Sequence, residues 1–191
     1  MARTDTVLAG HYFLGVEGLA LARFCLRDSA SIAPRVDEVL QIAATMDDFP
    51  NSLSIPMIEH DIDEGYTIWA GSYDGPNPAI EAEQPLVQAM LDAAGVGVAL
   101  DAACGTGRHA ARLVELGHRV IGVDATDAML AIAREKVPEA DFRRGRLEQL
   151  PVDDASVDLI TCSLALTHVP DLRPVMQEFA RVLKPGGTAV L

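Results

Sequence analysis

Residues 98–113 read VALDAACGTGRHAARL, and this stretch decides the fold. Its apolar start predicts a buried strand that ends at Asp101. Gly105 and Gly107 then let the backbone approach a ligand closely, and free amides at the start of the following helix favour an anionic group. After that helix a second apolar strand ends at Asp124. Strand, glycine loop, helix, strand and acid, in this order, predict one half of a nucleotide-binding α/β fold.

Two classes of ligand share this frame. The spacing Gly105-x-Gly107-x-x-Ala110 fits the dinucleotide fingerprint, with Asp124 placed to bind a ribose. Asp101 argues against a dinucleotide, because a pyrophosphate carries no cation that would favour a carboxylate just before the glycines. The amino-acid end of S-adenosylmethionine does carry an ammonium group. The residues therefore favour a sulfonium amino-acid nucleotide, and a helix-capping loop with an incidental Asp124 is the less favoured interpretation.

Four segments in order resemble the class I S-adenosylmethionine-dependent methyltransferases. LDAACGTG and VIGVDATDAML look like motif I and the acidic second motif, and LEQLPVDDASVDLITCSLALTHVPD and EFARVLKPGGTAVL are similar to later motifs. The match covers about residues 83–191, and it identifies the chain as a member of the methyltransferase-domain family of small-molecule type. The resemblance implies an α/β fold with a Rossmann-like doubly wound sheet. It also implies S-adenosyl-L-methionine as cofactor and in-line transfer of its methyl group to a small-molecule acceptor.

The resemblance assigns roles to individual residues. Asp101 is expected to orient the ammonium group, Asp124 to accept hydrogen bonds from both ribose hydroxyls, and Ser163 to lie beside the methionine moiety. The family commonly has an acid that binds the adenine amine where this chain has Arg146, which cannot accept from an amine; Leu147 still offers its amide. The full set of expected cofactor-binding residues is Tyr73, Asp101, Ala103, Gly105, Gly107, Asp124, Ala125, Met129, Leu147 and Ser163.

A general base is optional, because the methyl carbon of a sulfonium is already activated and the protein mainly aligns the nucleophile and excludes water. His168 is the candidate base, since it follows the fourth strand, where substrate approaches in such folds. A His in this loop also caps or packs in many proteins. No metal-ligand spacing is present in the sequence.

The chain divides into an N-terminal helical extension with a lid, residues 1–77, and a cofactor-binding domain, residues 78–191. Residues 61–65 are predicted as an acidic loop. Residues 66–74 carry three aromatics, and in the resembling family a Tyr-bearing segment here folds over the cofactor. Aromatic faces suit a sulfonium cation, but core packing explains these aromatics equally well.

The resembling family usually continues for two more strands and a helix, whereas this chain stops inside the predicted fifth strand, residues 188–191. We therefore expect a C-terminally truncated sheet that lacks the usual last strands. An exposed strand edge invites pairing. Either the sequence is a fragment or another chain supplies the missing neighbours, for which a homodimer pairing the fifth strand is one candidate.

Composition narrows the class of partner. The net charge of −13 argues against a nucleic-acid or anionic-membrane binder. Residues 7–26 are apolar, but Glu17 and Arg23 interrupt them, which is too broken for a membrane span. Three widely spaced cysteines, Cys25, Cys104 and Cys162, favour a reduced, cytoplasmic compartment.

Two other functions stay open on the sequence alone. One is a non-catalytic S-adenosylmethionine-binding or assembly module, inactive because the last strands are absent. The other is an NAD-dependent oxidoreductase, which shares the glycine-loop frame.

Overall fold

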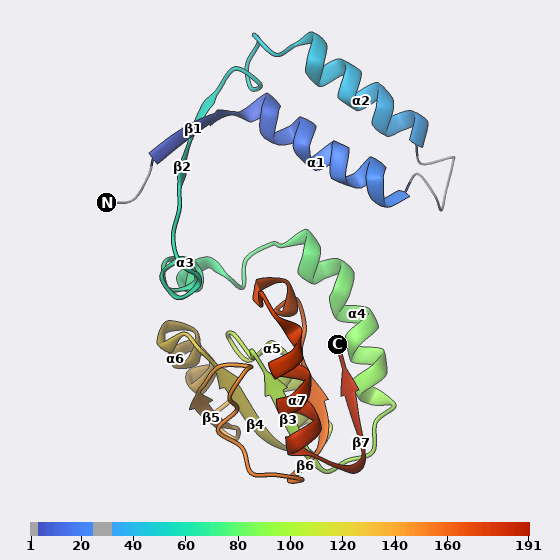
Figure 1. Cartoon of the computed structure of the whole chain (residues 1–191), viewed down its shortest axis with the longest axis vertical. Coiled ribbons are helices and arrows are strands. Elements are labelled where there is room, and N and C mark those ends of the chain that lie inside the picture. The colour runs from blue at the N-terminus through green and yellow to red at the C-terminus, as the bar shows by residue number, and fades with distance from the viewer. Residues whose placement is uncertain (1–3, 25–31) are drawn as a thin grey trace. The chain divides into compact units, whose positions relative to one another are not determined.

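The computed structural model describes residues 4–24 and 32–191, and it forms two compact units that divide between His60 and Asp61 (Figure 1). Cys25 lies outside the described residues.

The sequence places the domain division after residue 77, whereas the structure divides after residue 60. The reason is that the helix α3 (Ile62–Trp69) packs against the helix α6 (Asp127–Lys136) of the second unit.

The first unit pairs two helices with two strands. The strand β1 (Thr4–Leu8) leads directly into the helix α1 (Ala9–Phe24), which packs against the helix α2 (Ile32–Ala44). The strand β2 (Ser54–Ile58) runs antiparallel to β1. The sequence predicts a helical extension here and neither strand, because five-residue strands leave too short a pattern to separate from a loop.

The second unit is built on a parallel sheet of five strands in the order β5-β4-β3-β6-β7. The chain starts in the middle at β3, adds β4 and β5 on one side, and then crosses to add β6 and β7 on the other. The strands are β3 (Val98–Ala102), β4 (Arg119–Asp124), β5 (Asp141–Arg144), β6 (Val157–Thr161) and β7 (Leu183–Val190). This order confirms the predicted Rossmann-like doubly wound sheet, and ligands in such sheets bind where the strand order reverses, here between β3 and β6.

Successive residues of the central strands supply two separate cores, because side chains alternate across a strand. Ala99 and Leu159 pack on one face with α4 (Pro78–Asp92), α5 (Arg108–Glu115) and α6. Their neighbours Leu100 and Ile160 pack on the other face with α7 (Leu172–Val182). These six strand and helix side chains at the centre are fully or almost fully removed from water: Leu91, Ala99, Leu100, Leu113, Leu159 and Ile160.

The acidic residues before α3 begin a helix rather than a loop. Asp61 is the N-cap of α3, and its side chain accepts a hydrogen bond from the Glu64 amide at 2.8 Å. The prediction of an acidic loop over residues 61–65 is therefore wrong. An Asp followed by acidic residues in the first turn is a helix-start signal, since both satisfy or complement the free amides there.

The last strand also differs from its prediction. β7 begins at Leu183, but its pairing with β6 shifts register, so that Val157 opposes Leu183 whereas Leu159 opposes Thr188. The residues between them bulge out around Gly186, whose φ is +83°. The observed strand therefore begins five residues before the predicted one, residues 188–191, and includes this irregular segment.

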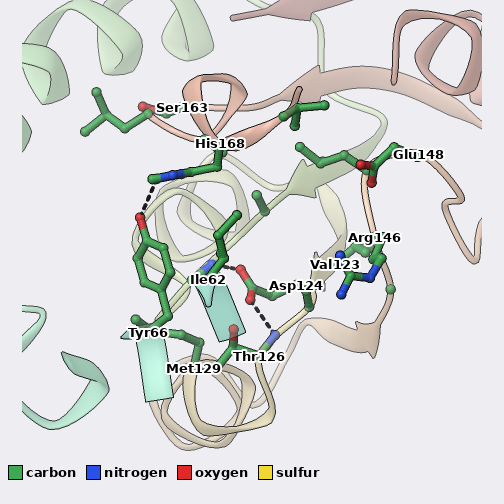
Figure 2. A pocket seen from close by; sticks show the side chains of 18 of the residues that line it. Ile62, Tyr66, Val123, Asp124, Thr126, Met129, Arg146, Glu148, Ser163 and His168 are labelled. Carbon is green, nitrogen blue, oxygen red and sulfur yellow. Dashed lines mark hydrogen bonds between the residues drawn. The ribbon is translucent and has the colours of Figure 1, made fainter. Parts of the chain in front are cut away.

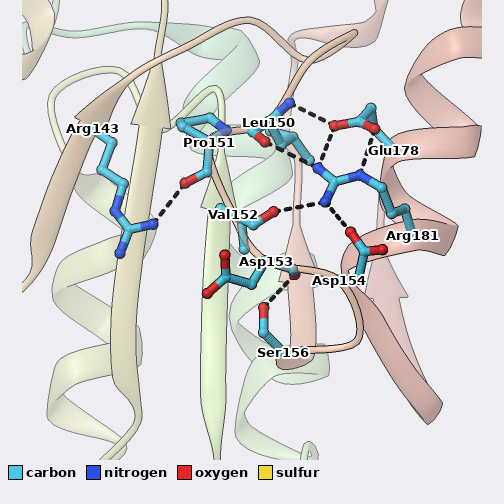
Figure 3. A network of polar contacts seen from close by, with 9 residues as sticks. All are labelled: Arg143, Leu150, Pro151, Val152, Asp153, Asp154, Ser156, Glu178 and Arg181. Atoms are coloured by element: carbon cyan, nitrogen blue, oxygen red, sulfur yellow. Dashed lines mark hydrogen bonds and ion pairs between the residues drawn. The ribbon is translucent and has the colours of Figure 1, made fainter.

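A network around Arg181 of α7 fixes the long segment between β5 and β6 (Figure 3). Its guanidinium donates to the carbonyl oxygens of Leu150 at 3.0 Å and Val152 at 2.8 Å. Glu178 forms an ion pair with Arg181 and accepts from the Leu150 amide at 2.7 Å. This segment is thereby held against α7, and its first residues reach the carboxyl ends of the strands.

Candidate functional site

The loop after β3 is held in a conformation that only some residues tolerate. Ala103, Gly105 and Gly107 have φ values of +58°, +52° and +81°. A Cβ added at Gly107 would lie 3.3 Å from the Cβ of Ala133 in α6. The left-handed backbone and the close approach of α6 together explain the glycine at position 107.

Asp124 stands at the end of β4, and its carboxylate accepts hydrogen bonds from two loops, the loop after β3 and the loop after β4. Its Oδ2 accepts from the Gly105 amide at 2.8 Å and its Oδ1 from the Thr126 amide at 2.9 Å. Burial raises the pKa of this carboxyl, and the amide hydrogen bonds work in the opposite direction. Each carboxylate oxygen keeps a further lone pair for a ligand.

An open pocket enclosing about 810 Å³ of empty space, solvent at its mouth included, lies at this edge of the sheet (Figure 2). Asp124 points into it, and residues from the ends of β3, β4 and β6 share its wall. Most of the residues expected to bind the cofactor line the pocket, as does the candidate base. These are Tyr73, Ala103, Gly105, Asp124, Ala125, Met129, Leu147, Ser163 and His168.

Asp101 and Gly107 are not among the lining residues. The Asp101 side chain is buried, and its Oδ2 accepts from the Ala110 amide of α5 at 2.8 Å. Burial raises the pKa of Asp101 to about 7. The structure thus gives Asp101 a contact beneath the glycine loop, whereas the sequence places it against an ammonium group.

The aromatic segment closes one side of the pocket. The Tyr66 hydroxyl of α3 lies 2.8 Å from His168 Nε2, which belongs to the short 3₁₀ helix η3 (Leu166–His168). The rings of Tyr66 and His168 meet edge to face with centroids 5.5 Å apart. Trp69 and Tyr73 extend this aromatic cluster with centroids 4.8 Å apart. The contact between Tyr66 and His168 therefore joins the aromatic segment, residues 66–74, to η3.

A second contact anchors the aromatic segment to the glycine loop. Asp74 Oδ1 accepts from the Thr106 hydroxyl at 2.7 Å, and Asp74 Oδ2 pairs with the Lys136 ammonium of α6 at 2.6 Å. Thr106 is buried. The sequence offered no signal for this contact, because its members are 30 or more residues apart.

Two charged residues stand in the wall near Leu147. Arg146 lines the pocket where the family commonly has an acid, and Glu148 lines it two residues later. Figure 2 shows both to the right of Asp124, on the side where Val123 lies. Glu148 was missed by the sequence analysis; its signal is an acid two residues before the Leu150-Pro151 pair, in the segment that resembles a family motif.

The two described cysteines are poor nucleophiles. Cys104 and Cys162 are both buried and free. Burial raises the pKa of the Cys104 thiol well above its usual value and that of Cys162 to about 12. Across residues 4–24 and 32–191, no three His, Cys, Asp or Glu side chains are grouped to hold a metal ion. In the same ranges no helix combines the length and apolarity needed to cross a membrane.

Comparison with known proteins gives a consistent result. A family model described as a methyltransferase domain matches residues 100–191. The chain is 43% identical over 93 residues to a demethylmenaquinone methyltransferase of Chlorobaculum tepidum, covering 48% of this chain and 38% of that protein. It is 35% identical over 127 residues to a ubiquinone biosynthesis O-methyltransferase of Xanthomonas oryzae pv. oryzae, covering 62% of this chain and 53% of that one.

A solved structure extends the likeness to the fold. The TehB-like S-adenosylmethionine-dependent methyltransferase of Corynebacterium glutamicum aligns with a TM-score of 0.51 at 30% identity. The alignment covers 66% of this chain and 70% of that one. The chain spans 38% and 53% of the two curated relatives above, so it matches only part of each.

Proposed function

We propose that this chain, which belongs to the class I S-adenosylmethionine-dependent methyltransferase family, transfers a methyl group from S-adenosyl-L-methionine to a small-molecule acceptor. S-adenosyl-L-methionine is the cofactor of this family, and it supplies an electrophilic methyl carbon on a sulfonium. What remains for the chain's own residues is to bind the cofactor, align the acceptor and exclude water.

The observation that carries the proposal is the position of Asp124. Its carboxylate lines the pocket while the Gly105 and Thr126 amides fix both of its oxygens. An acid at the end of the second strand of such a fold is placed for a ribose, and its free lone pairs can serve two adjacent hydroxyls. Two amide hydrogen bonds orient the carboxylate before any ligand arrives.

The lining on either side of Asp124 fits an adenosyl group. Ala125, Met129 and Leu147 provide an apolar slot beside the carboxylate, and Met129 and Leu147 are themselves buried. Tyr66 and Tyr73 also line the pocket, and their π-faces suit a cationic sulfonium. We propose that Asp101 acts by anchoring α5 under the glycine loop through the Ala110 amide, and not by direct contact with the cofactor.

The acceptor enters the proposal as a small molecule, as in the names of the two curated relatives, which refer to demethylmenaquinone and to ubiquinone biosynthesis. Ile62, Tyr66 and Val169 add apolar surface to the pocket lining. His168 is proposed to receive a proton from the acceptor, with the Tyr66 hydroxyl fixing its ring. An apolar acceptor that carries an ionisable group fits this arrangement.

Association with a second copy is a further part of the proposal. β7 is an outer strand of the described sheet, with only one neighbour, β6. An outer strand presents unpaired amides and carbonyls, which a second β7 could satisfy. Light scattering of the purified chain distinguishes a dimer from a monomer.

A calorimetric titration of the whole chain tests the function. We expect S-adenosylmethionine and S-adenosylhomocysteine to bind with one site per chain, and NADH to give no heat above dilution. Binding of NADH with no binding of either adenosyl ligand would favour the oxidoreductase alternative. Binding of the adenosyl ligands without turnover of any methyl acceptor would favour the non-catalytic module.

A further inference from the structure

Glu83 of α4 lies behind the pocket wall and joins three separate segments. The Ser163 hydroxyl, which follows β6, donates to Glu83 Oε1. Arg108 Nη1 donates to Glu83 Oε2 at 2.9 Å, and His109 Nε2 lies 3.2 Å from Oε1. The Glu83 side chain is only 15% exposed. The carboxylate is therefore fixed from both the α5 side and the β6 side.

The contact with Glu83 decides what Ser163 can offer to a ligand. A serine hydroxyl has one hydrogen to donate and two lone pairs that accept. The Ser163 hydrogen is committed to the Glu83 carboxylate, which cannot donate in return. Ser163 lines the pocket, so the hydroxyl presents only an acceptor to its contents. A hydroxyl that can only accept selects an ammonium, which donates, over a carboxylate, which has no hydrogen to give.

The position of Ser163 along the pocket fixes which part of the cofactor it meets. Asp124 and the apolar slot lie at the ends of β4 and β5, on one side of β3. Ser163 follows β6, on the other side of β3. Adjacent strands lie about 4.8 Å apart, so β4 and β6 are separated by roughly 10 Å. With the ribose at Asp124 and the base in the apolar slot, the amino-acid end falls at Ser163.

We propose that Ser163 and Glu83 form the recognition site for the ammonium group of the cofactor's amino-acid end. Ser163 accepts a hydrogen bond from the ammonium, and Glu83 is the positioning residue that orients the hydroxyl so that its lone pairs face the pocket. Arg108 and His109 hold the carboxylate against rotation. This assignment rests on the proposed function and takes the role that the sequence gives to Asp101.

Two ligands that differ only at the amino-acid end test the assignment. S-adenosylhomocysteine carries the ammonium, and 5′-methylthioadenosine has the same adenosyl group without it. We expect Glu83→Gln and Ser163→Ala each to weaken S-adenosylhomocysteine binding to the whole chain by about tenfold or more. Binding of 5′-methylthioadenosine is expected to stay within about twofold. Glu81→Gln removes the same charge from the exposed first turn of α4 and serves as the matched control.

The double variant separates a shared site from two independent effects. Because Glu83 acts through Ser163, combining the two substitutions is expected to weaken binding by no more than about twofold beyond the larger single effect. Ser163→Ala leaves the ion pair between Glu83 and Arg108 intact, so it stays informative if Glu83→Gln lowers the melting temperature.

The outcomes are distinguishable. Equal weakening of both ligands would show a structural role and overturn the assignment, as would unchanged affinity for S-adenosylhomocysteine in both single variants. Failure of the wild-type chain to bind either ligand would instead defeat the proposed function, and this assignment with it.

Discussion

The Tyr66 hydroxyl oxygen and His168 Nε2 lie 2.8 Å apart, although 102 residues separate them in the chain. The contact joins α3 to η3 beside the pocket into which Asp124 points (Figure 2). Burial raises the pKa of the Tyr66 phenol, which keeps the hydroxyl protonated near neutral pH. In the tautomer whose Nε2–H donates to the Tyr66 oxygen, Nδ1 keeps a free lone pair that can take a proton from the acceptor. The candidate base is thereby oriented by a group from the aromatic segment.

Tyr66→Phe tests this orientation. Losing the hydroxyl removes the contact with His168 but keeps the ring packing with Trp69 and Tyr73. We expect kcat for methyl transfer to fall by about tenfold, with S-adenosylhomocysteine affinity within about twofold. Tyr12→Phe, in the first unit, is the matched control. A large loss of cofactor affinity with unchanged kcat would contradict a role in orienting His168.

The raised pKa of Asp101 predicts a specific pH dependence of the free energy of unfolding. Its pKa in the folded state, about 7, lies above the value of about 3.9 of an unfolded aspartate. Stability from this group is thus fully present below about pH 4 and is lost as pH rises through about 7. Between pH 5 and 8 the wild type should lose about 1 to 3 kcal/mol more unfolding free energy than Asp101→Asn.

Urea unfolding at each pH measures this difference. Asp101→Asn keeps an oxygen that can accept from the Ala110 amide, so the variant isolates the charge. Parallel stability profiles of the two proteins over that range would show that Asp101 does not titrate with a raised pKa.

Gly107→Ala and Gly186→Ala separate backbone strain from crowding. Both glycines have similar positive φ values, +81° and +83°, but a Cβ at 107 meets Ala133 and Phe142 at 3.3 Å, whereas a Cβ at 186 meets nothing within 4 Å. We expect each to lose about 1 to 2 kcal/mol from the left-handed backbone, and Gly107→Ala to lose more. Thermal unfolding measures the stability of both variants. Equal losses of unfolding free energy would mean that α6 moves away from the added Cβ at position 107 without cost.

Arg181→Met tests the network that holds residues 145–155. The substitution keeps an apolar stem and removes the hydrogen bonds to the Leu150 and Val152 carbonyls. We expect a loss of about 1 to 3 kcal/mol of unfolding free energy. Chemical denaturation measures it, with Arg173→Met, on the exposed start of α7, as control. A loss no larger than that of the control would mean that the network contributes little.

Local patterns predicted the fold, whereas contacts between distant residues could not be predicted. The glycine loop, both flanking strands and Asp124 follow from a few adjacent residues whose spacing is itself the signal. Glu83 and Ser163 are 80 residues apart, and nothing near Glu83 in sequence marks it. The pairing of Tyr66 with His168 is hidden in the same way, because 102 residues separate them.

Asp101 illustrates a different limit. Its place at the end of a strand suggests a pocket residue, but side chains alternate across the strand. Ala99 and Asp101 lie on the face covered by α5, so Asp101 points under the loop to the Ala110 amide. Which helices cover each face of the sheet decides whether a strand residue faces the pocket or the core. The sequence alone did not show how the helices pack on the sheet.

The most direct test of the central claim is calorimetric titration of S-adenosylhomocysteine into the wild-type chain and Asp124→Ala. If Asp124 holds the ribose, the variant should bind more than about tenfold more weakly, a loss of at least about 1.4 kcal/mol. Equal affinities of the two proteins would mean that the ribose is held elsewhere and would contradict the account.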